Sequence, residues 1–398
     1  MQSSRGLIPL TLMFCLSLAW TGCASSSNTG GVNPPPPAAA NDFIYVANTA
    51  GAPSTVSAFT ADRTTGVMTE LSGSPYNAGS NAVAIVADPA GQFLFVANYS
   101  SGDISVFSIN ASSGTLTPVS GSPFACESGV DALAVDPTGR YLFAVGGLTG
   151  YMWTYSVSST GVLTPHQPTP FNGAFAYSSP SVMVAPADNY VYIAEPYPPA
   201  YPQYPSYILA FYFDPVSGDT IPSPGFFFAV DGLANQLAID PTGKFLLATG
   251  TQITGTLGGV TVFSVDGASG SLTPVAPIPP YFVQVGRDPA AVLTDHSGKF
   301  VYIPNTGDAT VSAFTLNSTG TLTEISGSPF PSGGNGSING PTGIATDMTA
   351  QFIYICNASN DISVFKIDKN TGALNPVTGS PFAERGSGPH GIVFVHRP

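Results

Sequence analysis

The amino-acid sequence predicts an all-β fold, a seven-bladed β-propeller of four-stranded blades, and three observations carry this prediction. Only 8% of the 398 residues are charged, while glycine and proline number 44 and 38, a composition typical of short strands joined by tight turns. An apolar hexapeptide such as Phe-Leu-Phe-Val-Ala-Asn recurs in seven copies, about 50 residues apart. Alternating apolar runs and turn residues fill each interval. Four-stranded units repeated in this way stack around an axis.

The N-terminal residues predict export. Residues 1–22 carry one positive charge, an apolar stretch too short to span a bilayer, and a small-residue region before Cys23. The ending Thr21-Gly22-Cys23 resembles the lipobox of bacterial lipoproteins, whose cysteine becomes lipidated, although Trp20 stands where that pattern usually has leucine. We therefore expect a lipoprotein signal peptide over 1–22, lipidation at Cys23, a Ser/Gly/Pro-rich tether over 23–41 and the propeller over 42–398. The expected location is the cell envelope, periplasmic or surface.

Within each copy, the hexapeptide is the first strand that the sequence shows clearly. Its odd and even positions are both apolar, so we expect the strand to be buried on both faces, between two neighbouring sheets. Each copy continues with an alternating run, a glycine-containing turn, a short segment such as LTPVSGSP and a third apolar run such as AVAIVADPAG. The seven hexapeptides begin at Phe43, Phe93, Tyr141, Tyr190, Phe245, Phe300 and Phe352.

Turn residues separate the strands of each copy. The segment Asp88-Pro89-Ala90-Gly91 places proline where a turn needs a fixed φ and glycine where it needs a positive φ, and similar segments begin at Asp136 and Asp240. Four hexapeptides end in asparagine, and we expect these side chains to hydrogen-bond the loop backbone. They are Asn48, Asn98, Asn305 and Asn357.

The two ends of the propeller are expected to share one blade. The repeat begins with the second strand of a unit, and the chain ends with Gly391–Val395, a first strand that lacks the rest of its unit. Pairing these segments would close the ring and cover strand edges that are otherwise exposed.

The motifs FLFVAN, DPTG, ISVF, TGxL and GSPF resemble those of the lactonase family of seven-bladed propellers, the 6-phosphogluconolactonase and cycloisomerase group. The resemblance covers the chain after the tether. It implies a ligand-binding face at the mouth of the central channel. It also implies that active members place His and Arg just before inner strands, in His-rich and Gly-Pro-Arg-His motifs, where they bind a carboxylate or phosphate and help to open or close a lactone ring.

The corresponding segment before the last inner strand reads Gly-Ser-Gly-Pro-His and lacks the arginine of that motif. Lactone hydrolysis needs a base for water and a cation for the developing oxyanion. A candidate acid-base site therefore consists of His390 with Arg385, Arg287, Asp288 and Glu195. The alternative is that these residues are rim charges that solvate the channel mouth. The missing arginine and histidine pairs favour a protein that is not an enzyme, and we expect no cofactor and no metal.

A tyrosine-rich insertion lengthens the loop of the fourth blade. Residues 195–207 contain five prolines and four tyrosines. Tyrosine surfaces suit sugars, peptides and protein partners, so Tyr197, Tyr201, Tyr204 and Tyr207 are candidate ligand-binding residues. Equally, the insertion could be a lid that packs on its own propeller.

These observations predict an exported, lipid-anchored lactonase-type propeller that acts as a binding module. Its partner would be an unknown small molecule, glycan or protein on the channel-mouth face. The net charge of −13 argues against nucleic acid. The alternatives are a lactone hydrolase resembling 6-phosphogluconolactonase and a surface-assembly scaffold. Cys126 and Cys356 are expected on opposite sides of the ring, too far apart for a disulfide.

Overall fold

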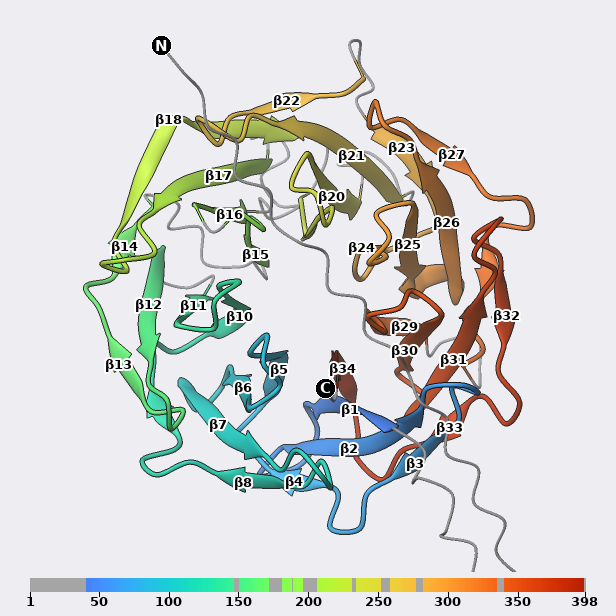
Figure 1. Cartoon of the computed structure of the whole chain (residues 1–398), viewed down its shortest axis with the longest axis horizontal. Helices are drawn as coiled ribbons and strands as arrows, with labels where there is room; N and C mark the ends of the chain where they lie inside the picture. The colour runs from blue at the N-terminus through green and yellow to red at the C-terminus, as the bar shows by residue number, and fades with distance from the viewer. Residues whose placement is uncertain are drawn as a thin grey trace, which may run out of the picture. The chain divides into compact units, whose positions relative to one another are not determined.

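Seven antiparallel β-sheets are arranged in a ring around a central axis (Figure 1), so the predicted seven-bladed β-propeller is confirmed. The computed structural model describes residues 41–396 except 147–149, 172–180, 188, 196–205, 231–233, 252–257, 277–281 and 335–339. Residues Ala39–Pro398 form one compact unit. Within the described ranges the single helical element is the short 3-10 turn η1 (Thr306–Asp308), and no helix there is long and apolar enough to cross a membrane.

Blade 2 shows the arrangement that the other blades repeat. Strand β5 (Ala82–Ala87) lines the channel, and β6 (Phe93–Asn98), β7 (Asp103–Ile109) and β8 (Leu116–Pro118) follow outward. A fifth, two-residue strand, β9 (Phe124–Ala125), also pairs with β7. The blades therefore contain four strands as predicted, and most add a short fifth strand at the outer edge.

The other complete blades follow the same order from the channel outward. Blade 3 comprises β10 (Val130–Val135), β11 (Tyr141–Gly146), β12 (Tyr151–Val157), β13 (Leu163–Pro165) and β14 (Thr169–Pro170). Blade 4 comprises β15 (Ser181–Val184), β16 (Tyr190–Glu195), β17 (Ser206–Phe213) and the long β18 (Thr220–Val230). Blade 5 comprises β19 (Gln236–Ile239), β20 (Phe245–Thr251), β21 (Gly258–Val265), β22 (Leu272–Pro274) and β23 (Phe282–Val285). Blade 6 comprises β24 (Leu293–Thr294), β25 (Phe300–Asn305), β26 (Thr310–Leu316), β27 (Leu322–Glu324) and β28 (Phe330–Pro331). Blade 7 comprises β29 (Pro341–Thr346), β30 (Phe352–Asn357), β31 (Asp361–Ile367), β32 (Leu374–Pro376) and β33 (Phe382–Ala383).

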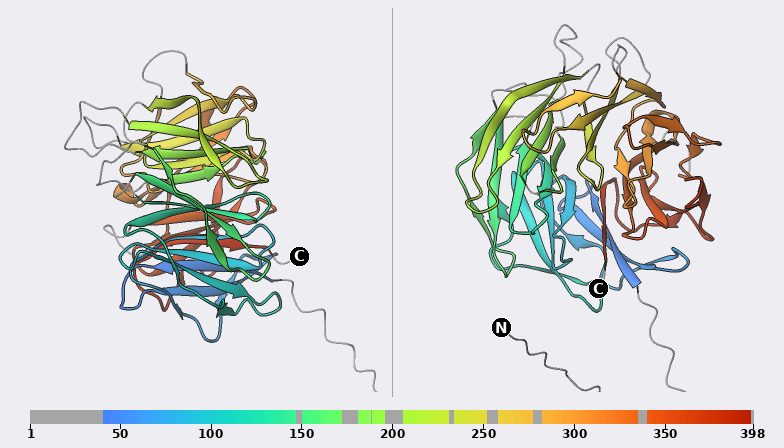
Figure 2. Two further views of the ribbon diagram at one scale, coloured as in Figure 1. Left: turned by 90° about the vertical axis from the view of Figure 1, so that its left-hand side faces the viewer. Right: turned by 45° about the horizontal axis from the view of Figure 1, so that its top comes forward.

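Blade 1 combines both ends of the propeller, which confirms the predicted closure. The inner strand is β34 (Pro389–Val395), and β1 (Asn41–Asn48), β2 (Thr55–Asp62), β3 (Met68–Glu70) and β4 (Tyr76–Asn77) complete the sheet. Strand β34 runs antiparallel to β1, with Val395 opposite Phe43 and Gly391 opposite Ala47. Figure 2 shows the dark red last strand beside the blue first strand. Strand β1 therefore has a partner on both sides.

The hexapeptide strands are buried on both faces, as their sequences predict. Every residue of β6 is buried, and its alternate side chains belong to different hydrophobic clusters. Leu94 and Val96 pack with residues of blade 1, whereas Phe95 and Ala97 pack with residues of blade 3. Each second strand thus joins its blade to both neighbours, and the hydrophobic core is a circle of interfaces between blades.

An aromatic side chain and a glycine meet at each of the seven interfaces. The aromatic residue opens the hexapeptide of one blade, and the glycine lies in an outer turn of the next blade with φ between +70° and +85°. A methyl group on any of these glycines would come within 2.4 to 2.7 Å of the aromatic ring. The pairs are Phe43 with Gly114, Phe93 with Gly161, Tyr141 with Gly218, Tyr190 with Gly270, Phe245 with Gly320, Phe300 with Gly372, and Phe352 with Gly66. Glycine is thus required twice, for its positive φ and for its missing side chain.

The Asp-Pro-type turns have the predicted geometry. Gly91 has φ of 64°, and the carboxylate of Asp88 accepts hydrogen bonds from the backbone N–H groups of Gln92 and Phe93. The Asp136 and Asp240 carboxylates accept the N–H of Tyr141 and of Phe245 in the same way, both at 2.6 Å. These aspartates therefore position the start of β6, of the hexapeptide strand at Tyr141 and of the one at Phe245.

The side chains of the strand-end asparagines mostly hydrogen-bond serine hydroxyls, whereas the sequence predicted bonds to the loop backbone. Among the described residues, Asn98 is the one of the four whose Oδ1 accepts a hydrogen bond from loop backbone, from Gly79 N–H at 3.1 Å. In all four blades the amide nitrogen instead donates to a serine hydroxyl on the next strand, at 2.9 to 3.0 Å. The serines are Ser57, Ser105, Ser312 and Ser363. The buried amide finds its partner across the sheet because the hydroxyl lies on the adjacent strand, which sequence spacing alone does not reveal.

The interface glycines generate a direct test. We expect Gly270→Ala to lower the free energy of unfolding by about 2 kcal/mol or more, because alanine resists positive φ and its methyl group would meet the ring of Tyr190. Gly267→Ala is the matched control, since Gly267 lies in the same turn and nothing lies within 4 Å of its added methyl group. Chemical denaturation of both variants measures the difference. Equal stability of the two variants would show that the aromatic and glycine contact is unimportant.

Candidate functional site

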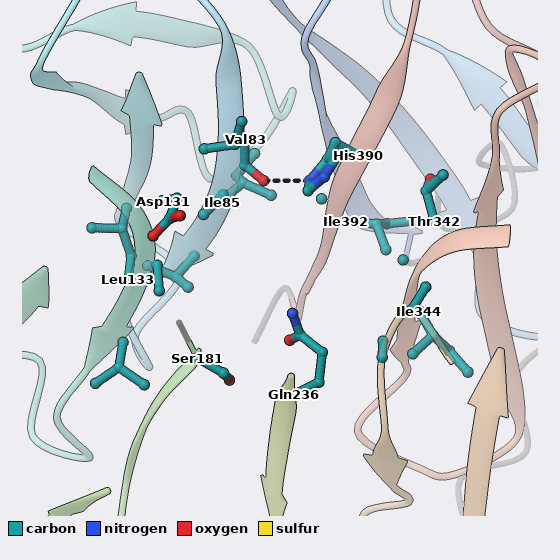
Figure 3. A pocket seen from close by; sticks show the side chains of 18 of the residues that line it. Val83, Ile85, Asp131, Leu133, Ser181, Gln236, Thr342, Ile344, His390 and Ile392 are labelled. Atoms are coloured by element: carbon teal, nitrogen blue, oxygen red, sulfur yellow. Dashed lines mark hydrogen bonds between the residues drawn. The ribbon is translucent and has the colours of Figure 1, made fainter. Parts of the chain in front are cut away.

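A cavity of about 700 Å³ lies where the inner strands of all seven blades converge. Residues of β5, β10, β15, β19, β29 and β34 line it, together with Ala290, Ala291 and Val292 just before β24. Figure 3 shows this cavity from close by. Because each blade contributes its innermost strand, the cavity is a direct consequence of the propeller architecture.

Seven branched aliphatic side chains, one from each blade, form what we call the apolar girdle of this cavity. In six blades the girdle residue lies opposite the fourth residue of the hexapeptide, as Ile85 lies opposite Val96. The girdle consists of Ile85, Leu133, Val182, Leu237, Val292, Ile344 and Ile392. This arrangement surrounds any occupant with apolar surface from every side.

Polar side chains also line the cavity, on one side of the girdle. Asp131, Thr342 and His390 each precede a girdle residue by two positions, and Figure 3 shows all three above their girdle residues. Ser181 and Gln236 each precede one by a single position. Thr342 donates its hydroxyl proton to Pro389 O at 2.8 Å, and Ser181 Oγ accepts the N–H of Leu237 at 3.2 Å. The cavity thus combines an apolar wall with a few convergent polar groups.

His390 is the sequence-predicted residue that the structure places in the cavity. Its Nδ1 lies 2.8 Å from Val83 O on the neighbouring inner strand. Because a carbonyl oxygen only accepts, Nδ1 must carry the proton. No described residue hydrogen-bonds to Nε2, which leaves that nitrogen for a ligand. His390 therefore links β34 to β5 and also faces the cavity.

Asp131 is the carboxyl group of the cavity, and the sequence interpretation missed it. Its Oδ1 is buried and has no hydrogen-bond partner among the described residues. Burial raises the pKa of Asp131 to about 8, and the neighbouring charge of Glu127 adds to this increase. A carboxyl group with such a pKa is substantially protonated at pH 7 and can donate a hydrogen bond. The available signal was a charged residue at an inward position of an inner strand in a chain with few charges.

Glu127 reaches this region because blade 3 lacks the strand-end asparagine. Gly146 occupies the position where other blades carry asparagine, and a methyl group there would come within 2.9 Å of Glu127 Oε1. The carboxyl group of Glu127, from the loop after β9, therefore lies in space that glycine leaves open. A substitution in one blade places a second carboxyl group next to Asp131.

The two predicted arginines lie in ion pairs. Arg287 Nε contacts Asp308 Oδ1 at 2.6 Å, and its guanidinium also donates to Gly307 O. Arg385 Nε contacts Glu70 Oε2 at 2.7 Å, across the interface between blades 7 and 1. Neither arginine lines the cavity within the described part of the chain. The structure therefore does not bring these guanidinium groups to His390.

The two other predicted acid-base residues also lie away from the cavity lining that the described residues form. Asp288 has φ of 50° and accepts the N–H of Thr306 through its backbone oxygen at 2.9 Å. Glu195 ends β16 and is 6% exposed, and burial raises its pKa to about 7. Glu195 is thus a buried residue at the strand-end position that carries asparagine in four other blades.

Of the predicted tyrosine surface, the structure describes Tyr207. It is half-buried in β17, packs against the core of blades 3 and 4, and its ring lies edge-to-face with Phe227 at a centroid distance of 5.6 Å. Tyr207 therefore packs on its own propeller. Tyr197, Tyr201, Tyr204 and the predicted lipidation site Cys23 lie outside the described residues.

The described residues also show the state of the cysteines and the placement of possible metal-binding side chains. Cys126 and Cys356 are both free thiols. Within the described ranges, no group of three or more His, Cys, Asp or Glu side chains is placed to hold a metal ion.

Comparison with known families agrees with the architecture and with the sequence motifs. The family described as Lactonase, 7-bladed beta-propeller, matches residues 24–122 and 258–387. The chain belongs to this lactonase family. The resemblance found in the sequence motifs is therefore confirmed. No curated protein matches the chain.

Solved structures with the same fold cover nearly the whole propeller. A putative 6-phosphogluconolactonase from Bacteroides fragilis is 17% identical, with a TM-score of 0.69, and the match covers 91% of this chain and 100% of that one. A periplasmic gluconolactonase from Pseudomonas aeruginosa is 18% identical, with a TM-score of 0.68 and coverage of 90% and 100%. A putative 6-phosphogluconolactonase from Bacteroides uniformis is 20% identical, with a TM-score of 0.68 and coverage of 89% and 100%. At these identities the similarity shows a shared fold.

The buried carboxyl group of Asp131 predicts a specific pH dependence of stability. Its pKa is higher in the folded state than in the unfolded chain, so its contribution to stability is full below about pH 4 and is lost as the pH rises through about 8. Asparagine cannot ionise, so the Asp131→Asn variant does not lose stability in this way as the pH rises. We expect the variant to become more stable than the wild type between pH 5 and 9, by on the order of 1 to 3 kcal/mol.

The matched control is Asp308→Asn. Hydrogen bonds from Arg287 lower the pKa of Asp308 in the folded state, so its removal should have the opposite effect as the pH rises. Urea denaturation of both variants and of the wild type at several pH values measures the two slopes. A flat difference between Asp131→Asn and the wild type would contradict the assignment of a raised pKa.

Proposed function

We propose that this lactonase-family propeller is a binding module that takes a small organic molecule into its axial cavity. The observation that carries the proposal is that Asp131, Gln236 and His390, from blades 3, 5 and 1, line the cavity together with the apolar girdle. A volume of about 700 Å³ lies within the range of small-molecule sites, roughly 300–1,000 Å³. Apolar walls with a few convergent polar groups are typical of such sites.

The arrangement of charges favours binding over catalysis. A cation beside the developing oxyanion would favour an enzyme that opens an ester. Arg287 and Arg385 are held by Asp308 and Glu70, and neither lines the cavity in the described part of the chain. Binding alone requires no such group.

Lactone hydrolysis is the second candidate, and membership of the lactonase family supports it. The names of two structural neighbours, a putative 6-phosphogluconolactonase and a periplasmic gluconolactonase, point to the same chemistry. In this reaction Asp131 or His390 would take a proton from water while the water oxygen attacks the carbonyl carbon. The ring C–O bond then breaks, and the proton passes to the departing ring oxygen. The product is a hydroxy acid.

We also propose that the protein acts at the cell envelope, anchored through Cys23. The apolar segment and the Thr21-Gly22-Cys23 ending support export. In that location the ligand would be an extracellular or periplasmic compound rather than a cytoplasmic metabolite.

A panel of uncharged five- and six-membered lactones and the corresponding sugars tests the function, with the purified mature chain. We expect at least one compound to raise the melting temperature without turnover, because a ligand that binds only the folded state stabilises it. Ile344→Trp should abolish the shift by filling the cavity, whereas Tyr212→Ala, at an exposed position on β17, should leave it unchanged.

Hydrolysis is followed in the same samples by titrating the acid released. Robust turnover that both Asp131→Asn and His390→Ala abolish would contradict the binding module and establish the hydrolase. An unchanged thermal shift in Ile344→Trp would show that the compound binds outside the axial cavity.

A further inference from the structure

We infer that the axial cavity selects an electrically neutral ligand and rejects phosphorylated and carboxylate compounds. This inference rests on the proposed function, because it concerns the ligand of the same cavity. It is carried by the distribution of charged side chains around the channel.

The cavity wall contains no lysine or arginine among the described residues. The undescribed segments between residues 147 and 339 contain none in their sequence either. Five cationic side chains contact carboxylates or backbone carbonyl groups away from the cavity lining. They are Arg63 with Asp42, Arg287 with Asp308, Arg385 with Glu70, Arg140 with Pro215 O, and Lys299 with Lys369 O and Asn370 O.

The titratable groups in and beside the cavity are mainly carboxyl groups, which supply no positive charge. Asp131 lines the cavity and Glu127 lies close enough to affect its ionisation. An anionic ligand would lose its water shell against the apolar girdle, and no fixed positive charge would replace that hydration. His390 is the single described lining residue that can become cationic. One imidazole in a cavity without lysine or arginine among its described lining residues is a poor anchor for a phosphate.

The same wall is well suited to a neutral polar molecule. The protonated form of Asp131 donates a hydrogen bond, and Gln236 offers both a donor and an acceptor. The hydroxyl of Ser181 accepts from Leu237 N–H and keeps its own proton to donate, while Thr342 donates to Pro389 O and keeps its lone pairs. A lactone or a sugar presents the matching set, with an apolar ring face for the girdle. The carboxylate formed by lactone hydrolysis would be expelled.

A matched pair of ligands tests the selectivity. D-glucono-δ-lactone and its 6-phosphate differ only in the phosphate group, and fresh solutions of each are titrated into the full mature chain at pH 6. We expect the neutral lactone to bind at least about tenfold more tightly. Gln236→Lys introduces a cation at a position that Figure 3 shows directed toward the cavity, and it should narrow this ratio by about tenfold or reverse it. Tyr212→Lys, which adds the same cation at an exposed position on β17 away from the cavity lining, should leave the ratio unchanged.

The outcomes separate this inference from the proposed function. Tighter binding of the 6-phosphate, abolished in Ile344→Trp, would overturn the charge selectivity and leave the binding cavity established. Binding of neither lactone would remove the support for a lactone ligand and would overturn both. A ratio that Gln236→Lys leaves unchanged would show that the charges of this wall do not set the selectivity.

Discussion

The contact between an aromatic ring and a positive-φ glycine at every blade interface is the constraint on which the propeller depends. Each blade supplies the ring from the start of its second strand and the glycine from an outer turn, so every blade is bound to both neighbours. The seventh contact, between Phe352 and Gly66, joins blade 7 to blade 1 and completes the circle. Because a side chain on any of these glycines would hold two blades apart, the contacts set the spacing between blades.

That spacing determines the channel. The hexapeptide strands are buried between neighbouring blades. The innermost strand of each blade lies between the hexapeptide strand and the axis, and residues of these strands line the cavity. An apolar girdle results where the same register position carries a branched side chain in six blades, and Val292 just before β24 completes it in blade 6. The chemistry of the cavity then comes from departures from the repeat, since Asp131 and His390 occupy a position that is Val83 or Ala290 in other blades. Fold and function thus use different residues of the same inner strands.

The sequence was sufficient to predict the blade count, the burial of the hexapeptides, the Asp-Pro turns and the closure by Gly391–Val395, because each depends on local patterns that repeat. The site was predicted less well. His390 lines the cavity as its place before the last inner strand suggested, whereas Arg287 and Arg385 lie in ion pairs with Asp308 and Glu70. Their partners are supplied by other loops and blades, and sequence proximity to an inner strand does not reveal such pairing.

The sequence by itself determined that the chain is a closed ring of seven related blades in the lactonase family, since periodic apolar patterns and turn residues act over a few residues. Only the tertiary structure decided which polar side chains share the cavity. Asp131 becomes a buried carboxyl group beside Glu127 because Gly146, on a neighbouring strand, leaves space that asparagine fills in other blades. The asparagines likewise find serine hydroxyls across the sheet. Both outcomes depend on what lies next to a residue in space, and strand pairing and blade packing establish those neighbours.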